Sequence, residues 1–411
     1  MTELEFAKKI DELGGKAYLV GGAVRDKFRG VQAHDRDYCV TGIDENTFIE
    51  GFPNAPKFGK SFPVYSVEID EVSCEVAFAR TEHKVGTGYR GFEILFAPSV
   101  TIEQDLYRRD TTINAMAIEL LSSELIDPFG GREDVLNKKI RAVSEHFTDD
   151  PVRALRAARQ AAQFDFEICA ETIEAMKICG KELADEPTER IFDELETALK
   201  TDKPSTFFRS LERANLLEIT FPEIAQLRGK IQLEIFHPEG DAYEHTLNIL
   251  DDVAKVNPRP LVRFAALAHD LGKGITPLEM LPHHYLHERR GLTVLSQMNR
   301  RMTLPNHWKK SAAFVIREHM RAPLLTKAGK IVELLLNLNS LKLGVKGFCD
   351  IIRFDNHGLP PYLEHAQEII DELLKIGGND APLELKGAEI GNWIQQKRIH
   401  HFLRIIKSFG K

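Results

Sequence analysis

The sequence predicts an α+β protein, in which a head built on a mixed β-sheet with flanking helices precedes an all-helical neck, body and tail. Short apolar runs bounded by Gly, Asp or Pro crowd the first 145 residues, a pattern typical of strands. From Asp150 onward, apolar residues recur at three- and four-residue spacing, which indicates nearly continuous helix. A chain of 411 residues has room for about two to four domains.

The expected parts are a head at 1–145, a neck at 146–230, a histidine-rich helical domain at 231–360 and a basic helical tail at 361–411. The strands of the head are expected at 16–22, 36–42, 62–69, 73–80 and 124–131, with a helix beginning at 23. The neck helices are expected at 150–164, 170–183, 188–200 and 204–217. A Pro/Gly/Asp-rich stretch at 236–245 then precedes the dense histidines.

The composition is that of an ordinary globular protein, with 43% hydrophobic and 28% charged residues and a net charge of −8. No apolar run approaches the roughly 20 residues that span a bilayer, and the N-terminal stretch lacks an apolar signal-peptide core. We therefore expect a cytoplasmic protein with no membrane partner. The five scattered cysteines favour reduced thiols, and the acidic balance still allows a local basic groove for nucleic acid.

The segment YLVGGAVRDKFRGVQAHDRDYCV ends in two alternate aspartates, Asp35 and Asp37. Residues two apart in a strand project from one face, so this pair would hold two carboxylates side by side. Oxygen ligands of this kind suit Mg²⁺ together with substrate phosphates, and two such ions could activate a 3′-hydroxyl and stabilise leaving pyrophosphate. Taken alone, the pair is more often a solvated strand end.

The residues before the aspartates favour a catalytic site over a solvated strand end. After an apolar strand, the backbone N–H groups of Gly21 and Gly22 can approach a triphosphate closely. Arg25 follows one helical turn later as a phosphate clamp. The plain alternative is a glycine turn with a surface arginine. Together with the aspartates, these residues indicate the palm of a nucleotidyltransferase of the polymerase-β type.

Two further places in the head offer candidate residues. Glu75, on a later strand, could be a third carboxylate or a general base, or else a structural or cross-strand charge. Arg108 and Arg109 precede Asp110 at the expected start of a small-residue helix that contains Asn114. Two arginines at a helix start are electrostatically unfavourable unless an anion binds there, so Arg109 is a candidate phosphate ligand. The alternative is a salt-bridged surface.

The stretch TDDPVRALRAARQAAQF opens the neck with Asp150 at the expected N-cap. A carboxylate accepts hydrogen bonds and a guanidinium only donates them, so Asp150 and Arg153 can pair with the amino and ring-nitrogen edge of cytosine or adenine. Uracil and guanine reverse both groups and would be rejected. The pair would thus select CTP and ATP without a nucleic-acid template, while Arg156 and Arg159 hold phosphates. The plain alternative is a capped helix with a basic solvated face.

Six motifs in order carry a resemblance to a known family: YLVGGAVRD, DRDYCV, ARTEHKVGTGYRGFEILFAPSVTIEQDLYRRDTTINAMA, LIDPFGG, DDPVRALRAAR and ERIFDELETAL. The chain resembles the class II tRNA nucleotidyltransferases, the CCA-adding enzymes, and among them the bacterial multifunctional type with a C-terminal HD domain. The resemblance covers essentially the whole chain. It implies nucleotide contacts from Gly22, Arg25, Arg109, Arg156 and Arg159, Mg²⁺ at Asp35 and Asp37, and base selection by Asp150 with Arg153.

Two positions depart from the family's pattern. Asp149 stands where the family usually has Glu, next to the retained Asp150, so we expect base selection to survive. Gln160 stands where the family usually has Phe, and we expect altered packing under the helix. The stretch 80–105 resembles the flexible loop that accompanies the switch from CTP to ATP in this family, which favours full CCA addition over a CC-only enzyme.

Histidines are dense beyond the Pro/Gly/Asp-rich stretch. An adjacent His269-Asp270 pair follows an apolar run and precedes LGKG, and other members of the group are His245, His284, His287, His319 and Asp355. The set resembles an HD-superfamily phosphohydrolase site, which implies that His245, His269, Asp270 and Asp355 ligate a divalent metal. Such a histidine-rich site suits Ni²⁺, Mn²⁺ or Zn²⁺, and metal-bound hydroxide could hydrolyse a phosphate ester or a 2′,3′-cyclic phosphate.

The leading prediction is template-independent, Mg²⁺-dependent addition of two CMP and one AMP to the 3′ end of tRNA, with release of pyrophosphate. Alternatives on the same head are an A-only enzyme, a CC-only enzyme or a poly(A) polymerase, and the acidic balance speaks against the last. A different class of alternative is an HD phosphohydrolase with a nucleotide-binding head. The expected partners are tRNA, CTP and ATP, and the expected state is a monomer or homodimer.

Overall fold

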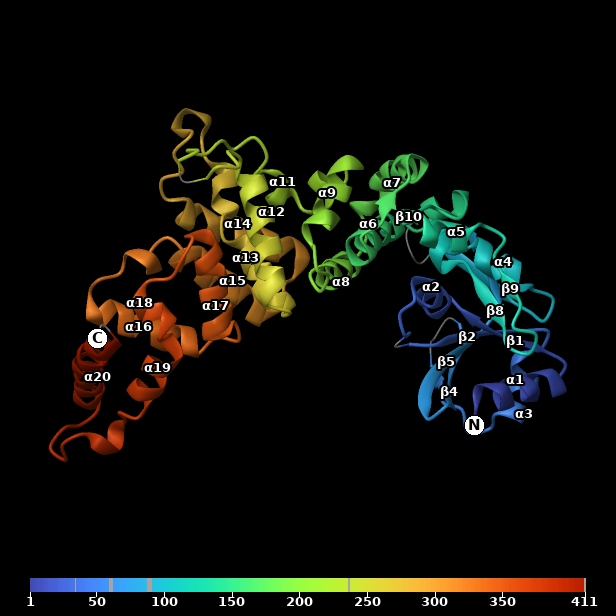
Figure 1. Ribbon diagram of the computed structural model, residues 1–411, viewed down its shortest axis with the longest axis horizontal. Helices are drawn as coiled ribbons and strands as arrows, with labels where there is room; N and C mark the ends of the chain where they lie inside the picture. The colour runs from blue at the N-terminus through green and yellow to red at the C-terminus, as the bar shows by residue number, and fades with distance from the viewer. Residues whose placement is uncertain (34, 59–61, 87–90, 236, 410–411) are drawn as a thin grey trace. The chain divides into compact units, whose positions relative to one another are not determined.

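The computed structural model describes residues 1–33, 35–58, 62–86, 91–235 and 237–409. The chain forms two compact units (Figure 1), one of Met1–Glu194 with Thr206–Thr220 and the other of Leu195–Ser205 with Phe221–Lys411. The first unit contains a mixed β-sheet with helices, and the second is built of helices. The predicted α+β fold class, a sheet-based head before a helical remainder, is confirmed.

The sheet of the head has seven strands in the order β3-β4-β5-β2-β1-β8-β9. β2 and β5 run parallel, and the other neighbouring strands run antiparallel. The strands are β1 (Lys16–Val20), β2 (Asp37–Thr41), β3 (Lys57–Phe58), β4 (Val64–Ile69), β5 (Val72–Phe78), β8 (Ala117–Glu119) and β9 (Leu125–Ile126). The strand expected at 124–131 shortens to β9, because the Asp127 carboxylate accepts hydrogen bonds from the backbone N–H of Gly131 and Arg132 and supports the start of α5 (Gly131–Leu136).

Each face of the sheet buries its own set of side chains, since successive residues of a strand point to opposite faces. On β2, Tyr38 and Val40 join an aromatic core with α1 (Glu3–Glu12) and α3 (Glu45–Gly51). Cys39 belongs to a second core, which includes Leu106 of α4 (Ile102–Tyr107). Asp37 is two residues before Cys39, so it is set on the face of the second core.

The prediction that a small-residue helix starts at Arg108 and Arg109 is wrong. Helix α4 ends at Tyr107 with Arg108 as its C-cap, and a short 3₁₀ turn, η1 (Thr112–Asn114), follows. The reason is Asp105, which is 1% exposed and lies 2.6 Å from Nη2 of Arg108 and 3.0 Å from Nη2 of Arg109. Cations are favoured at a helix C-terminus, so the two arginines close α4.

The neck helices form where the sequence predicts them: α6 (Val152–Phe164), α7 (Ala170–Leu183), α8 (Thr188–Ala198) and α9 (Ser205–Arg213). Pro151 stands at the boundary of α6, one position after the expected N-cap. Asp150 still supplies a capping oxygen, because its Oδ1 accepts a hydrogen bond from Val152 N–H at 3.2 Å.

The segment compared with the family's flexible loop forms a hairpin of β6 (Arg80–Lys84) and β7 (Phe92–Phe96). Its residues 87–90 lie outside the described part of the chain. A second small sheet pairs β10 (Lys139–Ile140) with β11 (Glu167–Ile168). In the described part of the chain, none of the helices combines the length and the apolar character needed to cross a bilayer.

The longer helices of the second unit surround an apolar core. They are α12 (Ala242–Val256), α13 (Pro260–Ala268), α14 (His287–Met302), α15 (Asn306–Glu318), α16 (Ala328–Asn339), α17 (Gly344–Asp355), α19 (Ala366–Leu374) and α20 (Ala388–Phe409). α13 packs against α12, α15 and α17, and all its residues from Leu261 to Ala268 are buried. A Cβ on Gly272, just after α13, would lie 1.8 Å from the carbonyl oxygen of His287. This close approach requires glycine and brings the segment after α13 against the first turn of α14.

Candidate active sites in the head and the histidine-rich domain

The glycine turn of the head lies at the edge of the sheet where β2 begins, because Val20 at the end of β1 is paired with Asp37. Gly21 has φ 66°, a left-handed conformation that favours glycine, and it precedes α2 (Gly22–Arg29). A Cβ on Gly21 would lie 3.0 Å from Nη1 of Arg109. The turn, the helix N-terminus and Arg109 are therefore neighbours, as an anion site requires.

Three carboxylates lie at the same edge of the sheet. Asp37 and Glu75 stand directly opposite each other on the parallel strands β2 and β5, and both are exposed, as is Asp35. The expectation that Asp35 and Asp37 share a strand face is wrong, because β2 begins at Asp37 and Asp35 precedes it. Partial loss of solvent raises the pKa of Asp37, and the Glu75 and Asp35 carboxylates raise it further against the effect of Arg109. Mutually repelling oxygens of this kind fit a divalent cation.

Asn114 joins the two phosphate-binding candidates of the head. Its side-chain oxygen accepts a hydrogen bond from Arg25 Nη1 at 2.6 Å, and its backbone oxygen accepts one from Arg109 Nη1 at 3.1 Å. The Arg25 guanidinium also lies 4.2 Å from the centre of the Phe164 ring and 3.0 Å from Asp26. Both cations are thus held in fixed positions. The Asp105 carboxylate binds Arg109 as well as Arg108, so the salt bridges predicted as the alternative are present at both arginines.

The predicted base-reading pair stands at the start of α6. Asp150 Oδ2 accepts a hydrogen bond from Arg190 Nη2 of α8 at 2.7 Å, and Arg190 in turn binds Glu186 at 2.6 Å. Arg153 is 7% exposed, donates to the carbonyl oxygen of His146 at 2.7 Å and lies 3.7 Å from Glu82. Sequence reasoning quoted Arg190 inside a motif but gave it no role, since its partner lies 40 residues away in the chain.

Arg156 and Arg159 do not stand free on a solvated face. Their Nε atoms both bind the carboxylate of Glu194, at 3.2 Å and 2.6 Å. The pKa of Asp110 is lowered: burial acts to raise it, but Arg156 and hydrogen bonds outweigh that effect. Arg156 therefore interacts with two carboxylates and Arg159 with one, and an incoming phosphate would compete with Glu194 for both arginines.

Gln160 forms a buried polar link where the family usually has an apolar ring. It is 1% exposed, its Nε2 donates to Asp110 Oδ2 at 3.1 Å, and its Oε1 accepts from Thr111 Oγ1 at 2.8 Å. Asp110 also accepts from Asn114 Nδ2 at 3.3 Å, and Asn114 holds Arg25. Gln160 thus belongs to a chain of hydrogen bonds from the neck helix to the candidate phosphate-binding edge of the head.

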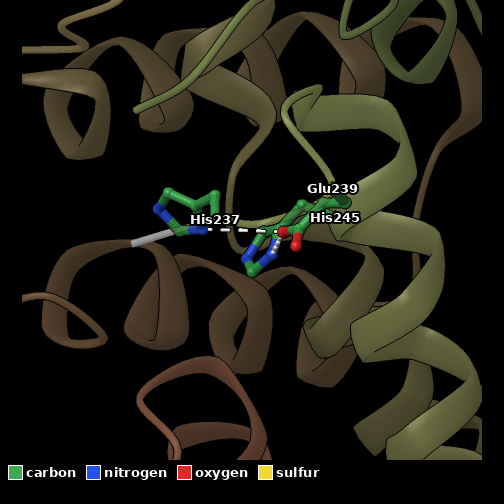
Figure 2. A group of neighbouring side chains, drawn as sticks. All are labelled: His237, Glu239 and His245. Atoms are coloured by element: carbon green, nitrogen blue, oxygen red, sulfur yellow. Dashed lines mark hydrogen bonds and ion pairs between the residues drawn. The ribbon is translucent and has the colours of Figure 1, made fainter. Parts of the chain in front are cut away.

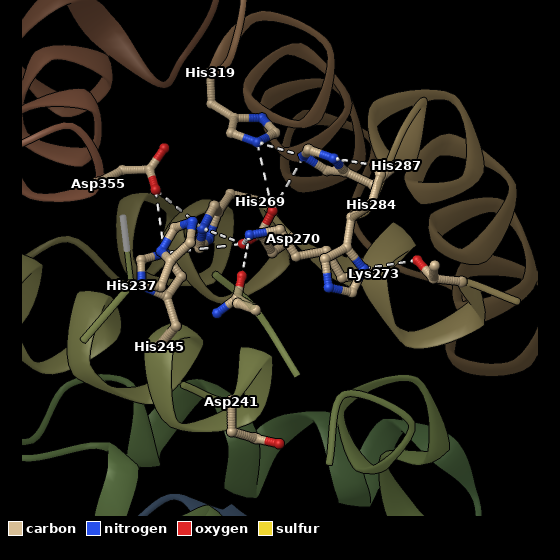
Figure 3. Close-up of polar contacts among 12 residues, drawn as sticks. His237, Asp241, His245, His269, Asp270, Lys273, His284, His287, His319 and Asp355 are labelled. Carbon is tan, nitrogen blue, oxygen red and sulfur yellow. Dashed lines mark hydrogen bonds and ion pairs between the residues drawn. The ribbon is translucent and has the colours of Figure 1, made fainter. Parts of the chain in front are cut away.

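The second unit contains a buried histidine–aspartate cluster (Figure 3). At its centre, Asp270 Oδ2 lies 3.1 Å from Nε2 of His269 and 3.9 Å from Nε2 of His245. Asp355 Oδ1 lies 3.2 Å from Nε2 of His245 and 3.5 Å from Nε2 of His269. The fold thus brings together all four residues that the resemblance indicated as metal ligands, from α12, the segment after α13 and the end of α17.

The other oxygen of Asp270 faces a second group. Its Oδ1 lies 3.3 Å from Nε2 of His287 and 3.5 Å from Nε2 of His319, and these two nitrogens are 3.1 Å apart. The ligating atoms of this trio are close enough to one another to hold a metal ion. Sequence reasoning noticed both histidines but gave them no ligand role, because each stands alone on its own helix. His284 lies apart, bonded to Thr276.

The charges of the cluster fit a bound cation. Burial acts to lower the pKa of His269, but the carboxylates of Asp270 and Asp355 raise it to about 10. Burial lowers the pKa of His287 to about 4, which leaves its ring neutral and able to ligate. Among the described residues, neither Oδ1 of Asp270 nor Nε2 of His269 finds a well-aligned hydrogen-bond partner. A divalent ion would satisfy these atoms and displace the proton of His269.

Two further side chains hold the cluster in place. The Glu239 carboxylate bonds to Nδ1 of His245 and lies 3.6 Å from Nδ1 of His237 (Figure 2). This contact orients the ring so that Nε2 of His245 faces the aspartates. Lys273 is buried, and its Nζ lies 2.5 Å from both Asp270 Oδ2 and Gln232 Oε1.

Three family models match successive parts of the chain. The model described as "Poly A polymerase head domain" matches residues 17–141, "Probable RNA and SrmB- binding site of polymerase A" matches 165–227, and "HD domain" matches 242–346. The "Multifunctional CCA protein" of Acinetobacter baumannii is 38% identical to this chain over 93% of it and 96% of the relative. That of Methylococcus capsulatus is 44% identical over 80% of this chain and 77% of the relative.

The chain belongs to the multifunctional CCA proteins. The predicted family and the predicted enzyme class, a CCA-adding tRNA nucleotidyltransferase, are confirmed. Solved CCA-adding enzymes share the fold: that of Thermotoga maritima complexed with tRNA_CCA has a TM-score of 0.62 at 21% identity and covers 99% of this chain and 94% of its own. That of Bacillus stearothermophilus in complex with CTP has a TM-score of 0.64 at 22% identity and covers 98% and 92%. The head and HD domain types imply dependence on divalent metal.

Proposed function

We propose that this enzyme adds two CMP and one AMP to the 3′ end of tRNA and releases pyrophosphate. The observation that carries the proposal is the meeting of the glycine turn, Arg25, Arg109 and the Asp37–Glu75 pair at one edge of the sheet. Solved relatives are described as complexes with ATP, CTP and tRNA, which supports these substrates.

The roles of the head residues follow from their placement. The backbone N–H groups of Gly21 and Gly22, with Arg25 and Arg109, bind the triphosphate. Asp35, Asp37 and Glu75 would hold Mg²⁺, which neutralises charge on the attacking and leaving oxygens when bound. As the 3′-oxygen bonds to the α-phosphorus, the bond to pyrophosphate breaks, and the hydroxyl proton passes to a carboxylate of this group.

Asp150 and Arg153 select the base, and the structure suggests how they are held. Arg190 fixes the Asp150 carboxylate from α8, while the His146 carbonyl fixes Arg153. The free faces of both groups then offer an acceptor and a donor to cytosine or adenine. Arg156 and Arg159 exchange Glu194 for a phosphate of the substrate.

Three tRNA transcripts test the proposal: one ending at the discriminator base, one ending in C and one ending in CC. Each is incubated with Mg²⁺ and one labelled nucleotide at a time. The expected result is two C additions, then one A addition, with UTP and GTP ignored. Addition of A alone or of C alone would divide the activity between enzymes and contradict the proposal.

We infer a second activity, hydrolysis of a phosphate ester or a 2′,3′-cyclic phosphate, from the buried cluster around Asp270. His245, His269, Asp270 and Asp355 would hold a divalent metal such as Ni²⁺ or Mn²⁺, which supplies an activated water when bound. The variant Asp270→Ala should lose hydrolysis of adenosine 2′,3′-cyclic phosphate and keep nucleotide addition. Hydrolysis that survives this change would place the activity elsewhere.

The free thiols of all five cysteines support a cytoplasmic enzyme.

A further inference from the structure

A cavity of about 780 Å³ opens beside the buried cluster, and the proposed hydrolysis does not account for its outer wall. His287 and Lys273, which belong to the cluster, line its inner end. Tyr285, Leu286 and Met320 line its outer part and are 64%, 53% and 47% exposed. Ligand pockets usually measure roughly 300–1,000 Å³, so this cavity has room for a ligand much larger than inorganic phosphate.

The outer wall presents a flat aromatic surface. The rings of His283 and Tyr285 stack with their centres 5.3 Å apart and an angle of 15° between planes. The next residue, Leu286, has φ 60°, a left-handed conformation that costs a non-glycine residue roughly 1–2 kcal/mol. Backbone outliers of this kind concentrate at ligand sites. Exposed rings on a constrained turn form a platform on which a nucleobase can stack.

The cavity also carries positive charge beyond that of the cluster. Arg317 and Arg321 share one carboxylate, Glu318, at 3.3 Å and 2.6 Å. Arg289, on the first turns of α14, has no ion-pair partner in the described part of the chain. The lining thus holds three arginines and one carboxylate, Glu288, while Glu318 pairs with two of the arginines from outside the lining, so the wall favours an anionic ligand.

We propose that this cavity binds the nucleoside of the substrate that is hydrolysed at the cluster, a ribonucleoside 2′,3′-cyclic phosphate. The base stacks on Tyr285, the cyclic phosphate reaches the Asp270 cluster, and the next phosphate of an RNA end lies at Arg289. In the reaction, the hydroxyl of water joins phosphorus, one ribose–phosphorus bond breaks, and the remaining water proton ends on the released ribose oxygen. Tyr285 and Arg289 are specificity residues, and the inference rests on the proposed hydrolysis.

Three substrates of increasing size test the cavity with metal-loaded enzyme: methyl riboside 2′,3′-cyclic phosphate, adenosine 2′,3′-cyclic phosphate, and an ApA dinucleotide with a terminal cyclic phosphate. Tyr285→Ala should raise KM for adenosine 2′,3′-cyclic phosphate about tenfold, which is equivalent to about 1.4 kcal/mol of stacking. The KM for the methyl riboside, which has no base, should change by less than about twofold. Arg289→Gln should raise KM about fivefold for the dinucleotide alone. The matched controls are Leu278→Ala and Arg300→Gln, exposed residues outside the cavity lining.

A binding measurement keeps the cavity testable apart from activity. Calorimetric titration of adenosine 2′-phosphate into metal-free protein should show affinity that falls about tenfold in Tyr285→Ala and not in Leu278→Ala. Variants that match their controls in both KM and affinity would overturn the cavity proposal while hydrolysis stands. Absence of hydrolysis with Mg²⁺, Mn²⁺, Co²⁺ and Ni²⁺ would instead overturn the proposed hydrolytic function. A Tyr285-dependent affinity would then still support nucleotide binding in the cavity.

Discussion

The two candidate sites both bring charged side chains together, but they differ in how far these side chains are buried. In the head, Asp35, Asp37 and Glu75 are exposed, and Arg156 and Arg159 of the neck form ion pairs with Glu194, which the substrate would replace under the proposed function. Around Asp270 the groups are almost fully buried, with His269 at 0% and Asp270 at 1% exposure. Partly exposed ion pairs contribute only about 0–1 kcal/mol each, whereas an uncompensated buried charge costs several kcal/mol. The head thus suits the proposed exchange of partners, and the cluster suits the proposed resident cation.

The largest difference between the two sites is expected from a change to the head carboxylates. Asp37→Ala should lower nucleotide addition on the order of a thousandfold, because the change removes a carboxylate of the proposed Mg²⁺ site. Hydrolysis of a cyclic phosphate by the same protein should be unchanged, which also shows that it is folded. The control Glu68→Ala changes an exposed residue of β4. Addition within tenfold of the parent enzyme would remove Asp37 from the catalytic site.

The cluster should respond to metal even without substrate. A divalent ion at 100 times its Kd stabilises the native state by about 2.7 kcal/mol, which raises the Tm of the unfolding transition of the second unit by roughly 5–10 °C. Asp270→Ala should abolish this shift, since both groups of ligands share Asp270. Differential scanning calorimetry with and without Mn²⁺ or Ni²⁺ measures it, with Asp371→Ala on α19 as the control. An equal shift in Asp270→Ala would mean that the ion binds elsewhere.

The selectivity among the four nucleotides shows whether the ion pair with Arg190 positions Asp150 for base selection. Arg190→Met removes the donor that fixes Asp150, so kcat/KM for CTP and ATP should fall about tenfold and incorporation of UTP or GTP should rise. If Arg190 had a merely structural role, kcat/KM would fall alike for all four nucleotides, and the ratios between nucleotides would stay unchanged. The control Arg213→Met changes an exposed arginine of α9.

The smallest effect is expected at the link between neck and head. Gln160→Leu breaks the hydrogen bonds to Asp110 and Thr111, and through Asn114 it loosens Arg25. One hydrogen bond contributes about 1 kcal/mol, so KM for both CTP and ATP should rise about two- to fivefold with their ratio preserved. Gln395→Leu on α20 is the exposed control. A changed C-to-A ratio would show that Gln160 acts on base reading instead of phosphate binding.

Features carried by neighbouring residues followed from the sequence. The Gly21–Gly22 turn and the adjacent His269-Asp270 each lie within one short segment, so spacing and side-chain chemistry predicted where they stand. The same reasoning failed for Asp35, because β2 begins only at Asp37. The neck helices were predicted for the same reason, since helical periodicity is a local property. The error at Arg108 and Arg109 came from taking them as a helix start. Asp105 pairs with them at i,i+3 and i,i+4 spacing, and its burial makes these arginines the end of α4.

The tertiary structure alone decided which distant groups meet. Asp150 finds Arg190, Gln160 finds Asp110, and Asp270 turns its second oxygen to His287 and His319. Each of these partners is separated by many residues, and either partner taken by itself looks like an ordinary polar side chain of a helix. Burial is what forces such groups to pair, because an unpaired polar group in the interior costs about 1–3 kcal/mol. Burial, unlike periodicity, depends on how the whole chain packs.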